Sequence, residues 1–255
     1  MSDPVLSVRK LVKRFGGLTA VKEVSFDVAA GEVVALLGDN GAGKSTLIKC
    51  VSGVHLPDGG EILFEGQPKT FAKPIDARSA GIETIYQDLA LANNLDVPAN
   101  IFLGREMKHR LLGGLIKTMD DKSMLREARE GLKALDIVFP TLTQPIESLS
   151  GGQRQAVAIA RAVYWKAKLM IMDEPTNNLG VPEQQKVLEL IRKLRDQGTP
   201  VILITHTMPD VFAVADRVIV MHRGRKVAEK STSATNSTEL VQYMVGALDD
   251  FAAAA

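Results

Sequence analysis

Short runs of consecutive apolar residues recur along the chain and predict strands that are buried on both faces of a sheet. Three such runs lie within residues 32–37, 168–172 and 201–205. Parallel strands have this composition because helices cover both faces of the sheet. Residues 6–9 and 24–28 instead alternate apolar and polar side chains, which is typical of antiparallel strands. The pattern predicts an α/β fold with a mixed sheet and an N-terminal antiparallel β portion.

A long central segment, residues 88–165, has a helical pattern. Helical signals predominate from 88 to 139, where no strand is predicted. Asp120 and Asp121 can cap a helix whose apolar residues recur at intervals of three and four, namely Leu125, Ala128, Leu132 and Leu135. A second helix follows Ser150. We predict one domain over 1–255, made of a core (1–87 and 166–230), a helical subdomain (88–165) and a C-terminal tail (231–255).

Residues that can take part in binding or catalysis follow four of the predicted strands. A glycine-rich segment, 38–46, follows the first apolar run, and Gln87 ends another predicted strand. Asp173 and Glu174 follow the second apolar run, and His206 follows the third. Ligands bind at the carboxyl ends of strands in sheets of this kind. The four positions therefore predict a single nucleotide site.

The glycine-rich segment fits the pattern G-x-x-x-x-G-K-[ST] of phosphate-binding loops. Its glycines allow successive N–H groups to turn inward around an anion. A predicted helix begins at Ser45, so phosphates would lie at a helix N-terminus. Lys44 adds a positive charge, and Ser45 offers a hydroxyl to Mg²⁺. The candidate phosphate-binding residues are Gly38, Asp39, Asn40, Gly41, Ala42, Gly43, Lys44, Ser45 and Thr46.

Transfer of a phosphoryl group to water needs charge neutralisation, a positioned water and a base. Asp173 can hold Mg²⁺ together with Ser45, and Glu174 is free to accept a proton from water. Gln87 can ligate Mg²⁺ or its water. His206 can contact the γ-phosphate or orient the water, although a lone histidine is more often structural. We interpret the remaining histidines as structural ones: His55, His109 and His222.

A second anion-binding helix end is predicted at Ser150, Gly151, Gly152 and Gln153. Either this end meets the same ATP as the first, or each ATP is shared with another copy of the chain, and both arrangements remain open. Phe15 precedes a double glycine and is either a core aromatic or a ring that stacks on adenine.

Composition excludes several classes of protein. The 255 residues are 45% hydrophobic with a formal net charge of +1, which gives no electrostatic case for a nucleic-acid partner. One cysteine, Cys50, excludes an internal disulfide and favours a reducing compartment. No apolar run reaches the ~18 residues of a spanning helix. We expect a soluble chain, any membrane role of which depends on another subunit.

Together these motifs resemble those of ABC-transporter ATP-binding subunits over nearly the whole chain. Residues 38–46 match the Walker A loop, 149–153 the signature motif and 169–173 the Walker B strand, with Glu174 at the catalytic glutamate. Gln87 matches the Q-loop, His206 the switch histidine and Phe15 the aromatic A-loop position. The resemblance implies a head-to-tail dimer that closes on ATP and Mg²⁺ and drives a membrane permease from the cytoplasmic face. A docking groove for the permease would include residues 87–102.

The finer resemblance is to ATPases of bacterial importers for ribose, fructose or xylose, which also work with a substrate-binding protein. It rests on residues 37–43, 100–106 and 174–181. Residues 14–21 also resemble branched-chain amino-acid importers, so that alternative stays open. A soluble ABC ATPase acting on nucleic acid or ribosomes is disfavoured by the near-neutral charge. Gly180 departs from the family, which has aspartate after Leu179 in the D-loop.

Overall fold

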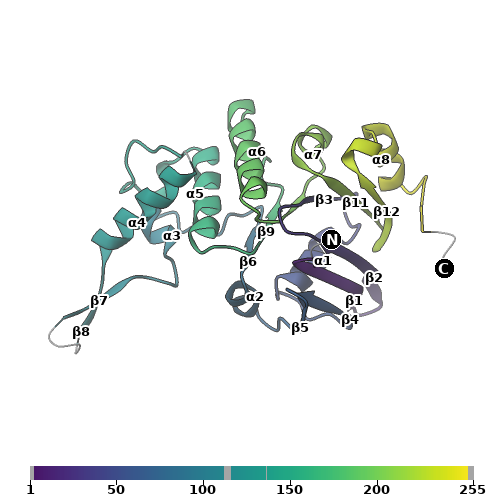
Figure 1. Cartoon of the computed structure of the whole chain (residues 1–255), viewed down its shortest axis with the longest axis horizontal. Helices are drawn as coiled ribbons and strands as arrows, with labels where there is room; N and C mark the ends of the chain where they lie inside the picture. The colour runs from purple at the N-terminus through teal and green to yellow at the C-terminus, as the bar shows by residue number, and fades with distance from the viewer. Residues whose placement is uncertain (1–2, 112–115, 136, 252–255) are drawn as a thin grey trace. The chain divides into compact units, whose positions relative to one another are not determined.

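The computed structural model describes residues 3–111, 116–135 and 137–251. The chain divides into two compact units (Figure 1). Unit 1 comprises Met1–Gln87, Ala167–Pro175 and Ile191–Ala255, and unit 2 comprises Asp88–Lys166 and Thr176–Leu190. Residues 176–190 are predicted from sequence to belong to the core, whereas the structure groups them with the helical unit. Within the described ranges, no helix is long and apolar enough to cross a membrane.

Unit 1 contains an antiparallel sheet of four strands among its described residues. Their order is β2 (Leu18–Val28), β1 (Leu6–Phe15), β4 (Gly59–Phe64) and β5 (Gln67–Lys69). Leu6, Ser7 and Val8 are all buried, so this part of β1 is covered on both faces although its sequence alternates.

A second sheet of unit 1, with six strands among the described residues, has parallel neighbours except at one edge. The order is β12 (Arg225–Ser231), β11 (Arg217–His222), β3 (Val33–Leu37), β10 (Val201–Ile204), β9 (Leu169–Asp173) and β6 (Ile82–Ile85). Only β12 runs antiparallel to its neighbour. Strands β3 and β10 are fully buried, as their continuous apolar runs predicted. The predicted α/β fold with a mixed sheet is confirmed.

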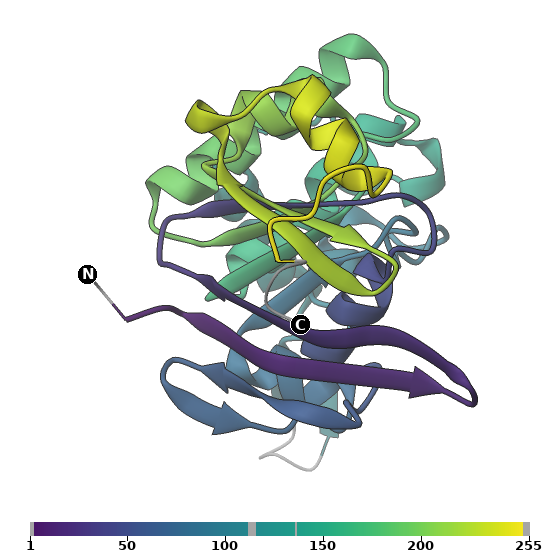
Figure 2. The same cartoon turned by 90° about the vertical axis from the view of Figure 1, so that its right-hand side faces the viewer.

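Helix α1 (Lys44–Val51) lies between the two sheets of unit 1 (Figure 2). Its buried Leu47 and Ile48 share one apolar cluster with Val8 of β1 and Leu36 of β3. Helices α7 (Met208–Val214) and α8 (Ser237–Met244) lie on the other face of the six-stranded sheet. A short helix α2 (Pro74–Ala80) precedes β6. Helix α1 is thus fixed from two sides by apolar packing.

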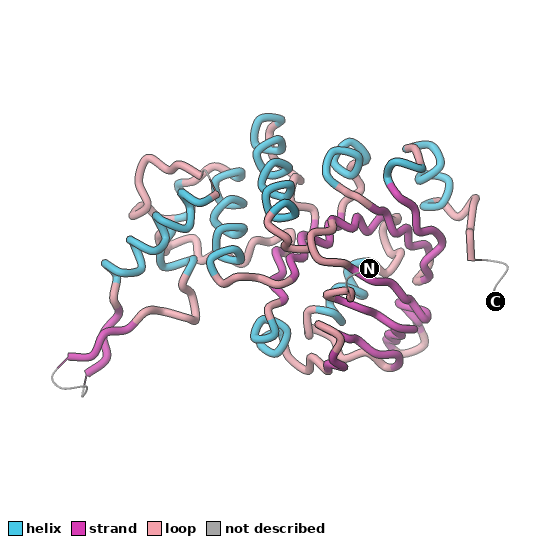
Figure 3. Tube along the Cα trace, viewed as in Figure 1, coloured by secondary structure: helices cyan, strands magenta, loops and turns pink. Residues whose placement is uncertain are grey.

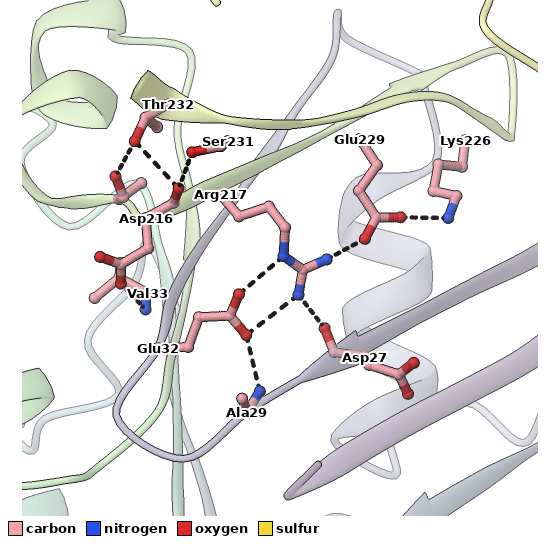
Figure 4. A network of polar contacts seen from close by, with 11 residues as sticks. Asp27, Ala29, Glu32, Val33, Asp216, Arg217, Lys226, Glu229, Ser231 and Thr232 are labelled. Atoms are coloured by element: carbon pink, nitrogen blue, oxygen red, sulfur yellow. Dashed lines mark hydrogen bonds and ion pairs between the residues drawn. The ribbon is translucent and has the colours of Figure 1, made fainter. Parts of the chain in front are cut away.

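A network of charged residues links the hairpin of β11 and β12 to the rest of unit 1 (Figure 4). Arg217 Nε donates to Glu32 Oε1 at 2.8 Å, its Nη2 donates to the carbonyl oxygen of Asp27 at 2.6 Å, and its Nη1 contacts Glu229. Burial opposes the guanidinium charge, but the hydrogen bonds and charges of Glu32 and Glu229 outweigh it and raise the pKa of Arg217. This network fixes the hairpin whose turn contacts the phosphate loop.

Unit 2 is mainly helical (Figure 3). It contains α3 (Val97–Ile101), α4 (Asp121–Ala134), α5 (Gly151–Tyr164) and the first half of α6 (Val181–Asp196), which continues into unit 1. Asp120 caps α4 by accepting from the N–H of Ser123, as the sequence indicated. Asn100 is fully buried and its side chain hydrogen-bonds the backbone of residues 92, 95 and 96.

The expectation that residues 88–139 contain no strand is wrong. Strands β7 (Lys108–Leu111) and β8 (Ile116–Met119) pair antiparallel in unit 2. Each strand has four residues and β7 is rich in basic side chains, so neither gives the long alternating pattern that identifies a strand in sequence. Gly113 and Gly114 between them are a turn signal in the sequence, although these residues lie outside the described ranges.

Candidate functional site

The register of the six-stranded sheet brings three of the predicted site segments to one edge. Ile204, the last residue of β10, pairs with Leu36 of β3 on one side and with Asp173 of β9 on the other. All three strands run parallel, so the residues that follow them emerge together. The phosphate loop, the acidic pair and His206 therefore meet at one edge of unit 1, with β10 in the middle.

The phosphate loop has a backbone that only glycine accommodates at two positions. Gly38 has φ +147°, and a Cβ there would lie 2.3 Å from the carbonyl oxygen of Met221. Gly43 has φ +101°, and its Cβ would lie 2.4 Å from the carbonyl oxygen of Ala20. The loop is therefore in close backbone contact with two neighbouring strands, β11 and β2.

Gly224, in the turn between β11 and β12, also supports this loop. Its N–H donates to the carbonyl oxygen of Ala42 at 2.9 Å, and its own carbonyl accepts from the N–H of Lys22 at 2.8 Å. The sequence gives no signal for this contact, because residues 42 and 224 are distant along the chain.

Lys44 is the first residue of α1, and its side chain extends toward the phosphate loop. Its Nζ donates to the carbonyl oxygens of Gly38 at 2.7 Å and Asp39 at 3.1 Å. An ammonium group has three donors, so a further one remains for a phosphate oxygen. Burial lowers the pKa of Lys44, although the charges of Glu174, Asp173 and Asp39 oppose that shift. The first turn of α1 itself carries no acidic residue, so within the helix the N-terminus favours an anion.

Glu174 and His206 form a direct pair. Glu174 Oε1 and His206 Nδ1 lie 2.8 Å apart, while the N–H of Glu174 donates to the carbonyl oxygen of Ile204 at 2.8 Å. Glu174 has φ +52°, a conformation that non-glycine residues adopt at a cost and that is common at functional sites. Its side chain is 16% exposed, whereas that of His206 is 63% exposed. The histidine thus covers a carboxylate that is largely shielded from solvent.

Asp173 has the environment of a cation ligand. Burial, and then the charge of Glu174, raise the pKa of Asp173, while Lys44 and Lys49 oppose the shift. A bound divalent cation would offset the cost of two adjacent carboxylates in this place. The described residues contain no group of three or more His, Cys, Asp or Glu that could form a complete protein cage. Mg²⁺ does not need one, because it takes one or two carboxylates together with phosphate oxygens and water.

Ser45, Thr46, Gln87 and Phe15 occupy positions around this edge with fewer contacts. Ser45 is exposed and Thr46 is half-buried in the first turn of α1. Gln87 lies two residues beyond the end of β6, is exposed, and makes no side-chain hydrogen bond with the described residues. Phe15 ends β1 and is 44% exposed, which excludes its interpretation as a core aromatic.

The second predicted anion site lies in unit 2 at the start of α5. Ser150 caps this helix: its Oγ accepts from the N–H of Gln153 at 3.3 Å, and Gln153 Oε1 accepts from the N–H of Ser150 at 2.9 Å. A Cβ on Gly151 would lie 3.0 Å from Leu179, and one on Gly152 would lie 2.5 Å from Cγ of Glu183. The two glycines thus allow α5 to pack closely against the start of α6, a role that the sequence did not indicate for Glu183.

Comparison with known proteins identifies the family of the chain. Residues 21–177 match the family model described as ABC transporter. The xylose/arabinose import ATP-binding protein XylG of Sulfolobus acidocaldarius is 49% identical, over 96% of this chain and 94% of that protein. The fructose import ATP-binding protein FrcA of Rhizobium meliloti is 46% identical, over 96% and 95% of the two chains.

A solved structure has the same fold. The nucleotide-free ATP-binding cassette of an ABC transporter is 26% identical with a TM-score of 0.80, and the alignment covers 95% of each chain. The segment matched by the family model contains both the phosphate loop and the acidic pair and spans more than half of the chain. With relatives close to half identical over almost their full length, this chain belongs to the ABC transporter family.

Proposed function

We propose that this chain binds and hydrolyses ATP and thereby drives the import of a sugar through separate membrane permease subunits. The main support for the proposal is that β10 pairs with β3 on one side and with β9 on the other. The phosphate loop and the acidic pair therefore lie on either side of His206, which follows β10. Charge neutralisation, a cation ligand and a base are thus available at one edge of one sheet.

In this proposal the triphosphate binds to residues 38–46. The N–H groups at the start of α1 and Lys44 neutralise its charge. Asp173 and Ser45 would hold Mg²⁺, with the amide oxygen of Gln87 as a further ligand. When bound, Mg²⁺ neutralises charge that develops on the phosphate oxygens. Phe15 stacks on the adenine with the exposed part of its ring.

Glu174 acts as the general base for the attacking water. The carboxylate is shielded from solvent and already hydrogen-bonded to His206, so proton transfer needs only a water within reach of its other oxygen. His206 holds Glu174 in place and, being largely exposed, can also contact the γ-phosphate or the water. The left-handed backbone at Glu174 holds its side chain at the strand end.

Ser150, Gly151, Gly152 and Gln153 bind the ATP held by a second copy of the chain. Two helix N-termini in one chain, each suited to an anion, support this head-to-tail dimer. Gly180 lacks the side chain usual at this position of the D-loop. In its place, Glu183 Oε2 lies 2.7 Å from where a Cβ on Gly180 would be.

Sugar is the cargo that the relatives favour. Two relatives that match over almost their whole length are named for the import of xylose or arabinose and of fructose. The ribose import ATP-binding protein RbsA 2 of Escherichia coli O157:H7 is 42% identical, although this chain spans only 47% of it. We therefore retain sugars and not branched-chain amino acids. The direct partner is a permease, which this chain meets at the cytoplasmic face, and a substrate-binding protein is an indirect partner.

Uptake by cells that lack the gene tests the proposal. We expect loss of uptake of labelled xylose, fructose or ribose, unchanged uptake of leucine, and rescue by the wild-type chain but not by Lys44→Ala. Loss of leucine uptake alone would support the amino-acid alternative. Normal uptake of all four compounds in a strain that expresses no second ATPase of this family would contradict a role in import.

A further inference from the structure

The loop that follows α1 is attached to the end of β1 by several polar contacts. The N–H of His55 donates to the carbonyl oxygen of Lys49 in α1 at 2.9 Å, which fixes the start of this loop. Lys13 Nζ donates to the carbonyl oxygen of Leu56 at 2.7 Å. Asp58 Oδ2 accepts from the N–H of Arg14 at 2.6 Å and pairs with Lys13 Nζ at 3.2 Å. Residues 55–58 therefore connect the end of α1 to the last residues of β1.

Phe15, the last residue of β1, is held from the side by this loop. Its ring and that of His55 are 5.2 Å apart at an interplanar angle of 74°, an edge-to-face geometry. Lys13 Nζ lies 5.5 Å from the centroid of the same ring. Phe15 nevertheless keeps 44% of its surface exposed. An exposed ring at a strand end has rotational freedom that an edge-to-face partner restricts.

The same ring is linked to the phosphate loop on its other side. Phe15 pairs with Leu18 across the turn of β1 and β2. Two residues further along β2, the carbonyl oxygen of Ala20 lies against Gly43, 2.4 Å from where a Cβ would be. Phe15 is thus connected to the beginning of α1 through β2 and to its end through His55. Both connections fix the ring relative to the helix that carries Lys44.

We infer that His55 is a positioning residue for the nucleobase: it holds the ring of Phe15 in the orientation that stacks on the base of ATP. The inference rests on the proposed stacking role of Phe15. His55 acts on the ring and not on the phosphates, so its effect is confined to ligands that carry a base. From the sequence, His55 is interpreted as a structural histidine. Its contact with Phe15 has no sequence signal, because the two residues are far apart along the chain.

Titration calorimetry of four chains tests the inference: wild type, Phe15→Ala, His55→Ala and the double variant, each with Mg-ATP and with magnesium tripolyphosphate. We expect His55→Ala to raise the Kd for ATP about two- to twelvefold, the range that an edge-to-face pair contributes beyond its buried area. The Kd for tripolyphosphate is expected to stay unchanged, which also shows that the variant is folded. In the Phe15→Ala background, His55→Ala is expected to have no further effect.

Two further variants sharpen the test. His55→Phe keeps an aromatic edge and is expected to restore the Kd for ATP to within about twofold of wild type. His109→Ala removes a histidine that hydrogen-bonds Thr118 in unit 2 and is expected to leave both affinities unchanged. In steady-state hydrolysis, His55→Ala is expected to raise KM for ATP while kcat at saturation stays the same.

The possible failures are distinguishable. If Phe15→Ala weakens ATP binding and His55→Ala does not, the inference about His55 is wrong and the stacking role of Phe15 stands. If His55→Ala weakens tripolyphosphate as much as ATP, the loop acts on the phosphate site and the inference is also wrong. If Phe15→Ala leaves the Kd for ATP unchanged, the proposed stacking fails and the inference fails with it.

Discussion

Replacing Gly43 by alanine places a methyl group against a backbone oxygen that has no room to move. The new Cβ would lie 2.4 Å from the carbonyl oxygen of Ala20, which belongs to the paired strand β2. The residue would also have to keep φ +101°. Gly41 is the matched control, because it has φ +80° and a Cβ there would meet nothing within 4 Å. Both substitutions carry a backbone cost, but only Gly43→Ala carries a steric one.

The two costs can be separated in magnitude. A left-handed backbone costs a residue with a Cβ about 1–2 kcal/mol. Forcing a methyl group into a close-packed place costs about 1–3 kcal/mol more. We therefore expect Gly41→Ala to lower the free energy of unfolding by about 1–2 kcal/mol and Gly43→Ala by about 2–5 kcal/mol. For a chain of this size, the difference corresponds to about 2–12 °C in Tm.

Scanning calorimetry of the ligand-free variants, at equal concentration and pH, measures this difference. Affinity for Mg-ATP is expected to fall more in Gly43→Ala, because the loop must shift away from β2 to relieve the contact. Equal Tm values for the two variants would refute the reasoning, since they would mean that the loop is not in close contact with β2.

Three other substitutions test separate parts of the account. Glu174→Gln is expected to keep ATP affinity and lower turnover by about 10²–10⁴, and unchanged turnover would exclude Glu174 as the base. Asp173→Asn is expected to abolish Mg²⁺-dependent hydrolysis yet raise Tm at pH 8. Burial and the charge of Glu174 raise the pKa of Asp173, so the charged carboxylate destabilises the wild-type fold at high pH. The difference in Tm between Asp173→Asn and wild type should therefore disappear as the pH falls toward about 4, the ordinary pKa of an aspartate. A difference in Tm that does not depend on pH would contradict this. Asn100→Ala is expected to destabilise unit 2 by about 1–3 kcal/mol, because the half-buried N–H of Ala92 loses its acceptor, Asn100 Oδ1; urea unfolding with a stability equal to wild type would show that this N–H is satisfied otherwise.

The central strands could be predicted because the apolar composition of each segment indicates that it is buried. Val33–Leu37 and Val201–Ile204 are continuous apolar runs, and Leu169–Asp173 is apolar up to Met172, as expected for strands buried on both faces of a sheet. The residues after them could be chosen as site candidates because parallel strands present their carboxyl ends on one side. The order of the strands, with β10 between β3 and β9, depends on crossover connections and has no local signal.

Other features depend on contacts between distant residues or on short elements. The hairpin of β7 and β8 escaped prediction because four-residue strands lack a measurable period. Contacts between distant residues, such as Gly224 with Ala42 and His55 with Phe15, are fixed by tertiary packing alone. The packing of Glu183 against Gly152 belongs to the same class. Sequence thus located the residues that could do the chemistry, whereas the residues that position them required the structure.

The most direct test of the account is the mass of Glu174→Gln in solution with and without Mg-ATP, measured by light scattering. Hydrolysis is slow in this variant, so an ATP-bound dimer would persist. The account predicts a mass near the 27.6 kDa of one chain without nucleotide and twice that mass at saturating Mg-ATP. The doubling should disappear when Ser150 is replaced by arginine, which blocks the N-terminus of α5 in the partner copy. A chain that binds Mg-ATP and stays at 27.6 kDa would contradict the proposal that two copies share each ATP.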